Sequence, residues 1–294
     1  MKYSNFAIVA SFFGLWINSF FSSGLQLFVG FLLILSFGIL HGANDIALII
    51  NVNNENKSFH FYKILIYYVF IVLTGAALFY VVPWLALALF ILVSGYHFGE
   101  QQWNEKLVDK RGLIKSLFQI VYGLLLLFLL FAFHLEEVQK VILAITTLRV
   151  PEFSFLFVLK ILAALYLLIS MHFYITHKDF KKFFFTELFY LLVFTIIFKV
   201  SSLIWGFALY FILWHSIPSI IDQIKFLYGN VCFSTFKLYF RSAFVYWIAS
   251  LAGITMLYII FKDQKIFNAL FFSFLASITF PHVFVIQKMF GKKK

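Results

Sequence analysis

Long runs of apolar residues, each interrupted by charged residues, proline or glycine, follow one another along almost the whole chain. A run of about 20 apolar residues is the length of an α-helix that crosses the hydrocarbon core of a bilayer. The pattern predicts ten such helices, at residues 5–21, 24–50, 62–82, 83–99, 113–134, 152–175, 183–199, 202–224, 238–261 and 266–288. We therefore expect an all-α polytopic protein of the cell (inner) membrane, with residues 1–294 forming a single multi-pass membrane domain.

The distribution of basic residues predicts how these helices are oriented across the membrane. With ten helices the loops alternate between two sides, and 17 of the 23 Lys and Arg residues fall on the side that carries both termini. The opposite side carries five: Lys140, Arg149, Lys199, Lys262 and Lys265. Because basic loops are retained on the cytoplasmic side of a membrane, this asymmetry predicts that both termini are cytoplasmic.

The composition excludes several classes of protein. Hydrophobic residues make up 63% of the chain and charged residues 12%, whereas a soluble domain is about 45–50% apolar and about 25% charged. The net charge of +11 is explained by basic cytoplasmic loops and does not indicate a nucleic-acid partner. The single cysteine, Cys232, excludes both an intramolecular disulfide and a metal site built from thiolates.

Histidines divide into two groups. His60 and His177 fall in predicted loops and His134 and His172 near predicted helix ends, so we expect structural roles for them. The other four fall inside predicted membrane helices, where ionisable residues are costly and usually functional. They are His41, His97, His215 and His282.

These four helices all run from the outer side to the cytoplasm. Each histidine lies about 13 to 17 residues from the start of its helix, which places all four about 20–25 Å from the outer surface. A common depth favours binding of one metal ion, and neutral imidazole suits iron, zinc, copper and nickel. The alternative is four unrelated core histidines, each hydrogen-bonded to a neighbouring helix.

Polar residues and prolines flank the four histidines. Asp45 follows His41 by four residues, so an unbroken helix would place its carboxylate on the same face, as a partner for the imidazole. Glu100 follows His97 by three residues, either as a similar partner or at a solvated helix end. Pro218 is expected to bend its helix beside the third histidine.

The four motifs identify a family. In chain order they are His41-Gly-Ala-Asn-Asp45, Gly95-Tyr-His97-Phe-Gly-Glu100-Gln101, Trp214-His215-Ser-Ile-Pro-Ser219 and Pro281-His282. Over roughly residues 30 to 288 the chain resembles the Brp/Blh family of bacterial and archaeal membrane β-carotene 15,15′-dioxygenases. The resemblance implies an Fe²⁺-dependent enzyme of the lipid bilayer that uses O₂ to cleave the central double bond of β-carotene, or a related carotenoid. It also implies two molecules of all-trans-retinal as product, delivered to a microbial rhodopsin as its chromophore.

The resemblance also implies the metal ligands. The family's first three histidine motifs map onto His41, His97 and His215. Many members have a further histidine four residues after the third, where this chain has Ser219. Either His282 completes the ligand set or three histidines and water suffice, and we expect Asp45, Glu100 and Ser219 to lie around the metal.

Two other functions remain open on the sequence alone. Four buried histidines also suit a membrane electron carrier that holds haem between histidine pairs. Intramembrane histidines together with Asp45 also suit the relay of a transporter or proton channel.

Overall fold

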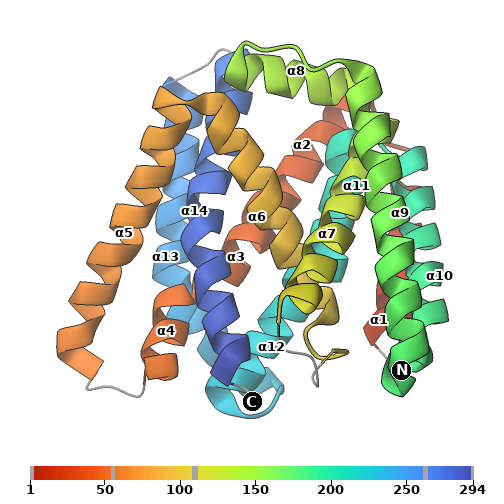
Figure 1. The fold of residues 1–294 in the computed structure, drawn as a ribbon. Helices are drawn as coiled ribbons and strands as arrows, with labels where there is room; N and C mark the ends of the chain where they lie inside the picture. The colour runs from red at the N-terminus through yellow and green to blue at the C-terminus, as the bar shows by residue number, and fades with distance from the viewer. Residues whose placement is uncertain (1–2, 54–56, 108–111, 261–263, 293–294) are drawn as a thin grey trace. The chain divides into compact units, whose positions relative to one another are not determined.

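The computed structural model describes residues 3–53, 57–107, 112–260 and 264–292. Several basic residues of the charge count lie outside the described residues: Lys2, Lys110, Arg111, Lys262, Lys293 and Lys294. Throughout the described residues the regular elements are helices and no strand occurs, as Figure 1 shows. The predicted all-α class is therefore confirmed.

The helices appear in the predicted order, with extra interruptions. Their bounds are α1 Tyr3–Asn18, α2 Ser23–Leu33, the π-helical turn η1 Ile34–Gly38, α3 Ile39–Gly42, α4 Asp45–Asn53, α5 Lys57–Val81, α6 Pro83–Trp103, α7 Leu113–Phe133, α8 Leu135–Thr146, α9 Glu152–Thr176, α10 Lys178–Val200, α11 Leu203–Tyr210, the π-helical turn η2 Phe211–Ser216, α12 Ile217–Tyr228, α13 Phe233–Ile260 and α14 Gln264–Lys292. Two predicted helices, 24–50 and 202–224, are thus divided by π-helical turns.

Seven helical segments of the described chain are long and apolar enough to cross a membrane. The expected number of ten is not confirmed, because α1, α6 and α13 are not among the seven. Helix α1 has only 16 residues, fewer than the roughly 20 needed to span the core. Helix α6 ends in a polar stretch, and α13 includes two residues, 257 and 258, whose side chains lie outside the described part of the chain. The orientation of the termini stays a prediction.

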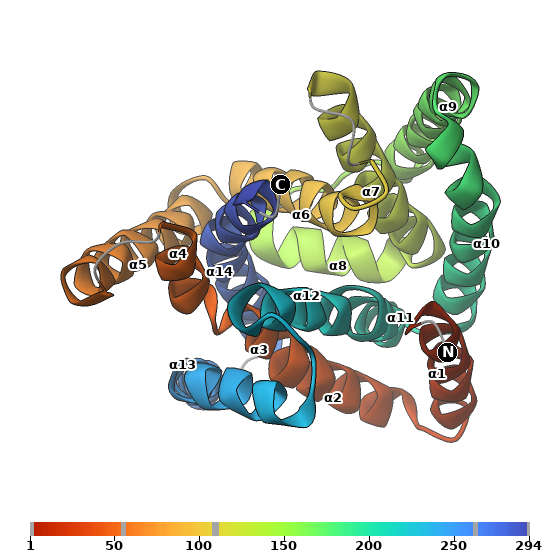
Figure 2. The same ribbon diagram turned by 90° about the horizontal axis from the view of Figure 1, so that it is seen from below.

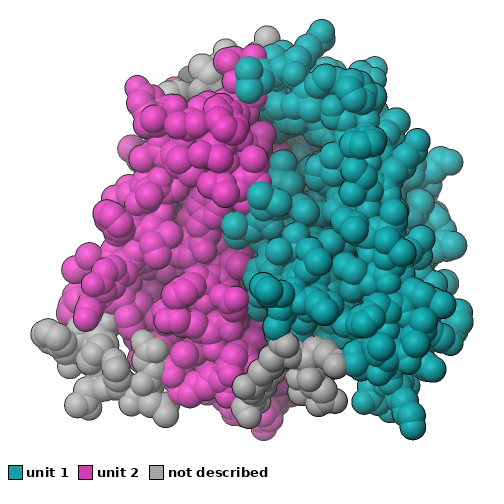
Figure 3. Space-filling view, viewed as in Figure 1, with its two compact units in different colours: residues 1–31, 91–143, 148–215 teal, residues 32–90, 144–147, 216–294 magenta. Residues whose placement is uncertain are grey.

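The chain divides into two compact units, coloured separately in Figure 3. Unit 1 comprises residues 1–31, 91–143 and 148–215, and unit 2 comprises residues 32–90, 144–147 and 216–294. We describe each unit by itself. The expectation of a single membrane domain over residues 1–294 stays a prediction.

Aromatic side chains form much of the interior of unit 1, where α7 packs against α9 and α10 (Figure 1). Trp103 stacks on Phe180 with ring centres 5.4 Å apart, and Phe118 stacks on Tyr166 at 5.5 Å. All four side chains are at most 2% exposed. In a bilayer such packing is the main source of cohesion between helices, because lipid offers apolar side chains the same environment.

The C-terminal part of α6 lies directly against α7. A Cβ added at Gly99 would lie 1.8 Å from the carbonyl oxygen of Gln119, and one added at Gly123 would lie 1.8 Å from the carbonyl oxygen of Gly95. Side chains would keep the two backbones apart, so glycine is required at this contact. The same part of α6 carries His97, whose position therefore depends on this packing.

Unit 1 also holds a buried ion pair. The Glu187 carboxylate, only 1% exposed, lies 2.6 Å from the ammonium group of Lys106. It also accepts a hydrogen bond of 2.7 Å from the amide of Gln102. A buried carboxylate needs such donors to offset its lost hydration, so this contact joins α10 to the C-terminal end of α6 and the residues just beyond it.

In unit 2, α14 packs against α4 and α5, and α3 packs against α12 and α13, as the view in Figure 2 shows. One apolar cluster contains Leu48 of α4 with Val285, Ile286 and Met289 of α14, each at most 2% exposed. Helix α5 has exposed apolar side chains along its length, for example Ile66 at 67%. Exposed apolar residues at this density indicate a lipid-facing surface.

Candidate metal centre

His41 lies just after a π-helical turn. Within this turn, η1 (Ile34–Gly38), the carbonyl of Ser36 accepts a hydrogen bond of 2.8 Å from the indole N–H of Trp247, in addition to one from the backbone N–H of Ile39. Short α3 then carries His41 and ends at Gly42, and α4 begins at Asp45 after two residues of turn. Single π-helical turns occur frequently at functional sites.

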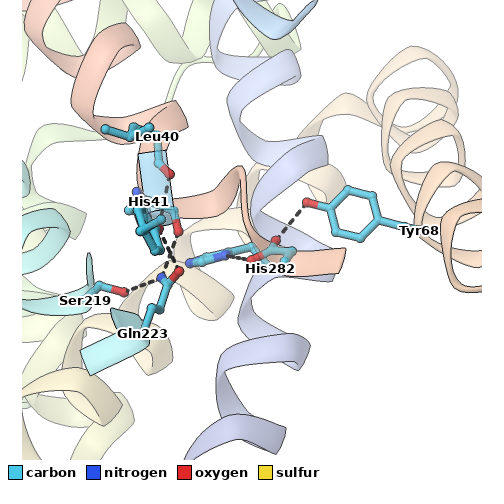
Figure 4. Close-up of polar contacts among 8 residues, drawn as sticks. Leu40, His41, Tyr68, Ser219, Gln223 and His282 are labelled. Atoms are coloured by element: carbon cyan, nitrogen blue, oxygen red, sulfur yellow. Dashed lines mark hydrogen bonds and ion pairs between the residues drawn. The ribbon is translucent and has the colours of Figure 1, made fainter. Parts of the chain in front are cut away.

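His282 of α14 lies next to His41, with ring centres 4.6 Å apart and ring planes at 88°. The Nδ1 atom of His282 is 2.8 Å from Oδ1 of Asp45, and both side chains are at most 4% exposed. The hydroxyl of Tyr68 donates to the other oxygen, Oδ2, at 2.9 Å. Figure 4 shows this line of contacts from Tyr68 to His282.

The expected partner of Asp45 needs correction. The spacing of four residues from His41 predicts a contact only if the helix continues through both residues. Because α3 ends at Gly42, the Asp45 carboxylate is directed instead to His282. An Nδ1–H donated to a carboxylate fixes the tautomer of His282, with the lone pair on Nε2, as in many metal-binding histidines.

Ser219 and Gln223 of α12 approach the backbone of His41 (Figure 4). The Nε2 atom of Gln223 donates to the carbonyl oxygen of His41 at 2.8 Å and to the Ser219 hydroxyl at 3.0 Å. Both side chains are fully buried. Ser219 is thus placed in the same polar cluster as His41, through Gln223.

Unit 1 contains the second pair of histidines. His97 of α6 and His215 of η2 have ring centres 4.6 Å apart with planes at 80°. The ring of Phe98 lies 4.8 Å from that of His215, and Phe211 stacks on it at 5.5 Å. Both histidines are at most 2% exposed, so the pair lies in an apolar, water-poor environment.

The irregularity expected at Pro218 is present as the π-helical turn η2 (Phe211–Ser216). Proline has no N–H and its ring collides with the carbonyl four residues earlier, so an α-helix cannot continue unchanged before it. The carbonyl of Leu213 accepts a hydrogen bond of 2.6 Å from the hydroxyl of Tyr3. The indole N–H of Trp214 donates to Ser11 at 3.0 Å. Two residues of α1 therefore hold the turn that carries His215.

Glu100 is buried at 4% exposure, which excludes a solvated helix end. Its Oε1 accepts a hydrogen bond of 2.9 Å from the hydroxyl of Tyr96 on the same helix. Its expected role beside His97 stays a prediction.

The remaining histidines are only partly as expected. His134 ends α7 and its Nε2 lies 2.8 Å from the carbonyl oxygen of Phe198, a structural contact. His172 lies exposed on α9, and His177 lies between α9 and α10. His60 belongs to α5 rather than to a loop, and its side chain is outside the described residues.

The spacing within each pair fits binding to a common ion. An imidazole bound through nitrogen at about 2.1 Å has its ring centre about 3.2 Å from the metal. Two such rings about 90° apart around the metal have centres about 4.6 Å apart. Both observed pairs have this spacing and a nearly perpendicular arrangement.

Three polar residues of the site were not predicted from the sequence: Tyr68, Gln223 and Tyr239, whose hydroxyl donates to Gln223 at 2.8 Å. Each lies on a helix remote in sequence from His41, so no spacing rule connects them to it. A glutamine in the last turns of an apolar helix is the one available signal, because its burial requires hydrogen-bond partners.

Comparison with known proteins agrees with the motifs. The family model described as beta-carotene 15,15'-dioxygenase matches residues 32–290, most of the chain. Neither the curated proteins nor the solved structures include a significant match to the chain. The match covers all four histidines and confirms the resemblance drawn from their motifs. The chain therefore belongs to the beta-carotene 15,15'-dioxygenase family and is a carotenoid-cleaving dioxygenase.

Proposed function

We propose that this protein binds Fe²⁺ through His41, His97, His215 and His282 and uses O₂ to cleave β-carotene at its central double bond. The observation that carries the proposal is the pairing of the four buried histidines, each pair with ring centres 4.6 Å apart. A ligand set of neutral imidazoles suits iron, and the single cysteine, Cys232, cannot build a thiolate site that would favour a softer metal. Bound iron would supply the activation of O₂.

The surrounding residues would orient the ligands and keep water away. Asp45 holds the His282 ring through Nδ1, and Tyr68 holds the Asp45 carboxylate. Phe98 and Phe211 pack on His215 and offer apolar walls beside the candidate ligand. β-Carotene carries no polar group, so shape and apolar contacts must position it. Water excluded from the site cannot compete with O₂.

The pair spacing argues against haem. Two imidazoles on opposite sides of a haem iron would have ring centres about 6.4 Å apart, twice the distance from ring centre to metal. The observed 4.6 Å in each pair is too short for such an arrangement.

The product of central cleavage is two molecules of all-trans-retinal, and we propose that these serve a microbial rhodopsin in the same inner membrane. Both substrate and product dissolve in lipid. A multi-pass enzyme in the same bilayer is therefore well placed for their exchange.

Expression of the protein in bacteria that make β-carotene tests the proposal. We expect loss of orange colour and accumulation of retinal. His41→Ala and His97→Ala should each lower bound iron and abolish retinal formation while the protein remains in the membrane. His172→Ala, which alters an exposed imidazole outside the site, is the control and should behave as wild type. Apocarotenals of unequal length, or normal iron and retinal in both site variants, would contradict the proposal.

A further inference from the structure

The α-helix that carries His41 ends one residue later, and a new helix begins at Asp45. Helix α3 ends at Gly42, and the N–H of Ala43 makes a long hydrogen bond of 3.3 Å to the carbonyl of Leu40. Carbonyl groups at a helix end need partners from outside the helix. The partners here come from α12 and α13.

The side-chain amide of Gln223 binds at this helix end, and its hydrogen bonds allow the amide only one orientation. The carbonyl of His41 can only accept, so the atom facing it at 2.8 Å must be Nε2, the donor. The same Nε2 donates its other hydrogen to the Ser219 hydroxyl at 3.0 Å. The oxygen of the amide then faces Tyr239, whose hydroxyl donates to it at 2.8 Å.

Tyr239 is itself tied to the break. Its hydroxyl lies 3.4 Å from the carbonyl of Leu40, and its own backbone carbonyl accepts a hydrogen bond of 3.0 Å from the Asn44 side chain. The side chains of Gln223, Tyr239 and Asn44 are at most 1% exposed. Residues on both sides of His41 are therefore held by one closed set of hydrogen bonds.

Apolar side chains enclose these hydrogen bonds. Leu40, Ile220, Ile224 and Ala243 form a buried cluster together with the ring of Tyr239. In a medium of low polarity each hydrogen bond is strong, and each unpaired group is costly. Removal of the Gln223 amide would leave the carbonyl of His41 without this donor, and the break would rearrange to find another.

We infer that Gln223 is a positioning residue for His41, with Tyr239 holding its amide in the required orientation. The inference rests on the proposed function, because it assigns these residues to the alignment of a metal ligand. Gln223 acts on the backbone of His41 rather than on its ring. It sets the direction in which the imidazole leaves the chain, without touching metal or substrate.

The substitution Gln223→Met tests this, because methionine keeps the size of the side chain and removes its donors and acceptor. We expect kcat per bound iron to fall about tenfold or more, as for other residues that orient metal ligands, with KM for β-carotene within about twofold of wild type. The visible absorption bands of the Co²⁺-loaded protein should also shift, since they report ligand geometry. Tyr239→Phe keeps the ring packing and should give a smaller change of the same kind.

Gln139→Met is the matched control. The amide of Gln139 likewise donates to a backbone carbonyl, that of Val150, but between α8 and the start of α9. It should leave kcat and the Co²⁺ spectrum unchanged. If the Gln223→Met protein does not accumulate in the membrane, the kcat per iron and the Co²⁺ spectrum of Tyr239→Phe test the inference.

Failure of the inference is distinguishable from failure of the proposed function. A wild-type protein that forms no retinal or binds no iron would overturn the proposed function. An active wild type with unchanged kcat per iron and an unchanged Co²⁺ spectrum in both variants would overturn the inference only.

Discussion

The Asp45 carboxylate connects His282 to Tyr68 within unit 2. It is 1% exposed, and two donors from different helices, His282 and Tyr68, satisfy one oxygen each. An ionised carboxylate in so dry a place is stable only with such charge-assisted partners. Its negative charge in turn makes the other nitrogen of His282 a better ligand.

Asp45→Asn keeps the shape of the side chain and removes its charge. We expect iron affinity or retinal formation to fall about 10–100-fold, the usual effect of losing a carboxylate that orients a metal-binding histidine. Tyr68→Phe should act in the same direction but less, since one of the two donors remains. Bound iron per protein and the rate of retinal formation measure both effects.

Asp179→Asn is the control for this pair. Asp179 is an exposed carboxylate that forms an ion pair of 2.6 Å with Lys182 on the same helix. It should retain wild-type iron and activity. Wild-type values in Asp45→Asn as well would remove Asp45 from the site.

The sequence identifies the histidines and Asp45 but not the pairing between them. Four buried imidazoles and one carboxylate are conspicuous in apolar helices, so composition alone finds them. The spacing argument then joins Asp45 to His41, because it assumes an unbroken helix. The actual partner, His282, lies 237 residues away in the chain. No local pattern encodes such a contact.

At the scale of elements, the contact between α6 and α7 positions His97. At Gly99 of α6 a carbonyl group of α7 occupies the place of a side chain, and at Gly123 of α7 a carbonyl group of α6 does so. The sequence predicts both helices closely, at 83–99 and 113–134 against the observed Pro83–Trp103 and Leu113–Phe133. It misses helix α8, because the Glu136 and Glu137 that open it also suit a polar loop.

Gly99→Ala should separate the two helices. The added methyl group would meet the Gln119 carbonyl at 1.8 Å, and backbone cannot move aside as a flexible side chain can. We expect a loss of stability of about 1–3 kcal/mol or more, with reduced retinal formation because His97 lies two residues away. Thermal unfolding in detergent and a retinal assay measure the two effects.

Gly253→Ala in α13 provides the comparison. Nothing lies within 4 Å of a Cβ at that position, and alanine favours helix more than glycine does. This variant should be at least as stable as wild type. Equal stability of both variants would show that α6 and α7 are not in close contact.

At the scale of the whole molecule, the basic residues and Cys232 bear on membrane orientation. The single cysteine is exposed and lies between α12 and α13, in a stretch that the charge pattern assigns to the cytoplasm. A hydrogen bond with the Ser234 hydroxyl, and further ones with Thr235, lower the pKa of the Cys232 thiol to about 7. A substantial fraction is therefore thiolate, the reactive form, at neutral pH.

We expect a membrane-impermeant maleimide to leave intact cells unlabelled and to label Cys232 once the inner membrane is opened. In opened membranes the labelling rate should rise with pH and reach half its maximum near pH 7, because a lowered pKa moves thiolate formation to lower pH. Cys232→Ser should remain unlabelled throughout. Labelling of intact cells would place this loop outside and reverse the predicted orientation.

The number of membrane crossings is less predictable than their positions. Apolar runs locate the helices, but α1 is too short, and the end of α6 too polar, to resemble typical spans. Such helices can lie at membrane depth when their polar groups are buried against other helices, whereas lipid would leave these groups without partners. A hydropathy pattern does not distinguish the two environments.

The π-helical turns η1 and η2 have a consequence for how the chain tolerates change. Each turn holds one residue more than an α-helix would, so the faces before and after it differ in phase by about 100°. The length of each π-helical turn should therefore matter more for function than the identity of its apolar residues. Ile34–Gly38 should accept exchanges among apolar residues, whereas a one-residue deletion there rotates His41 away from its partner.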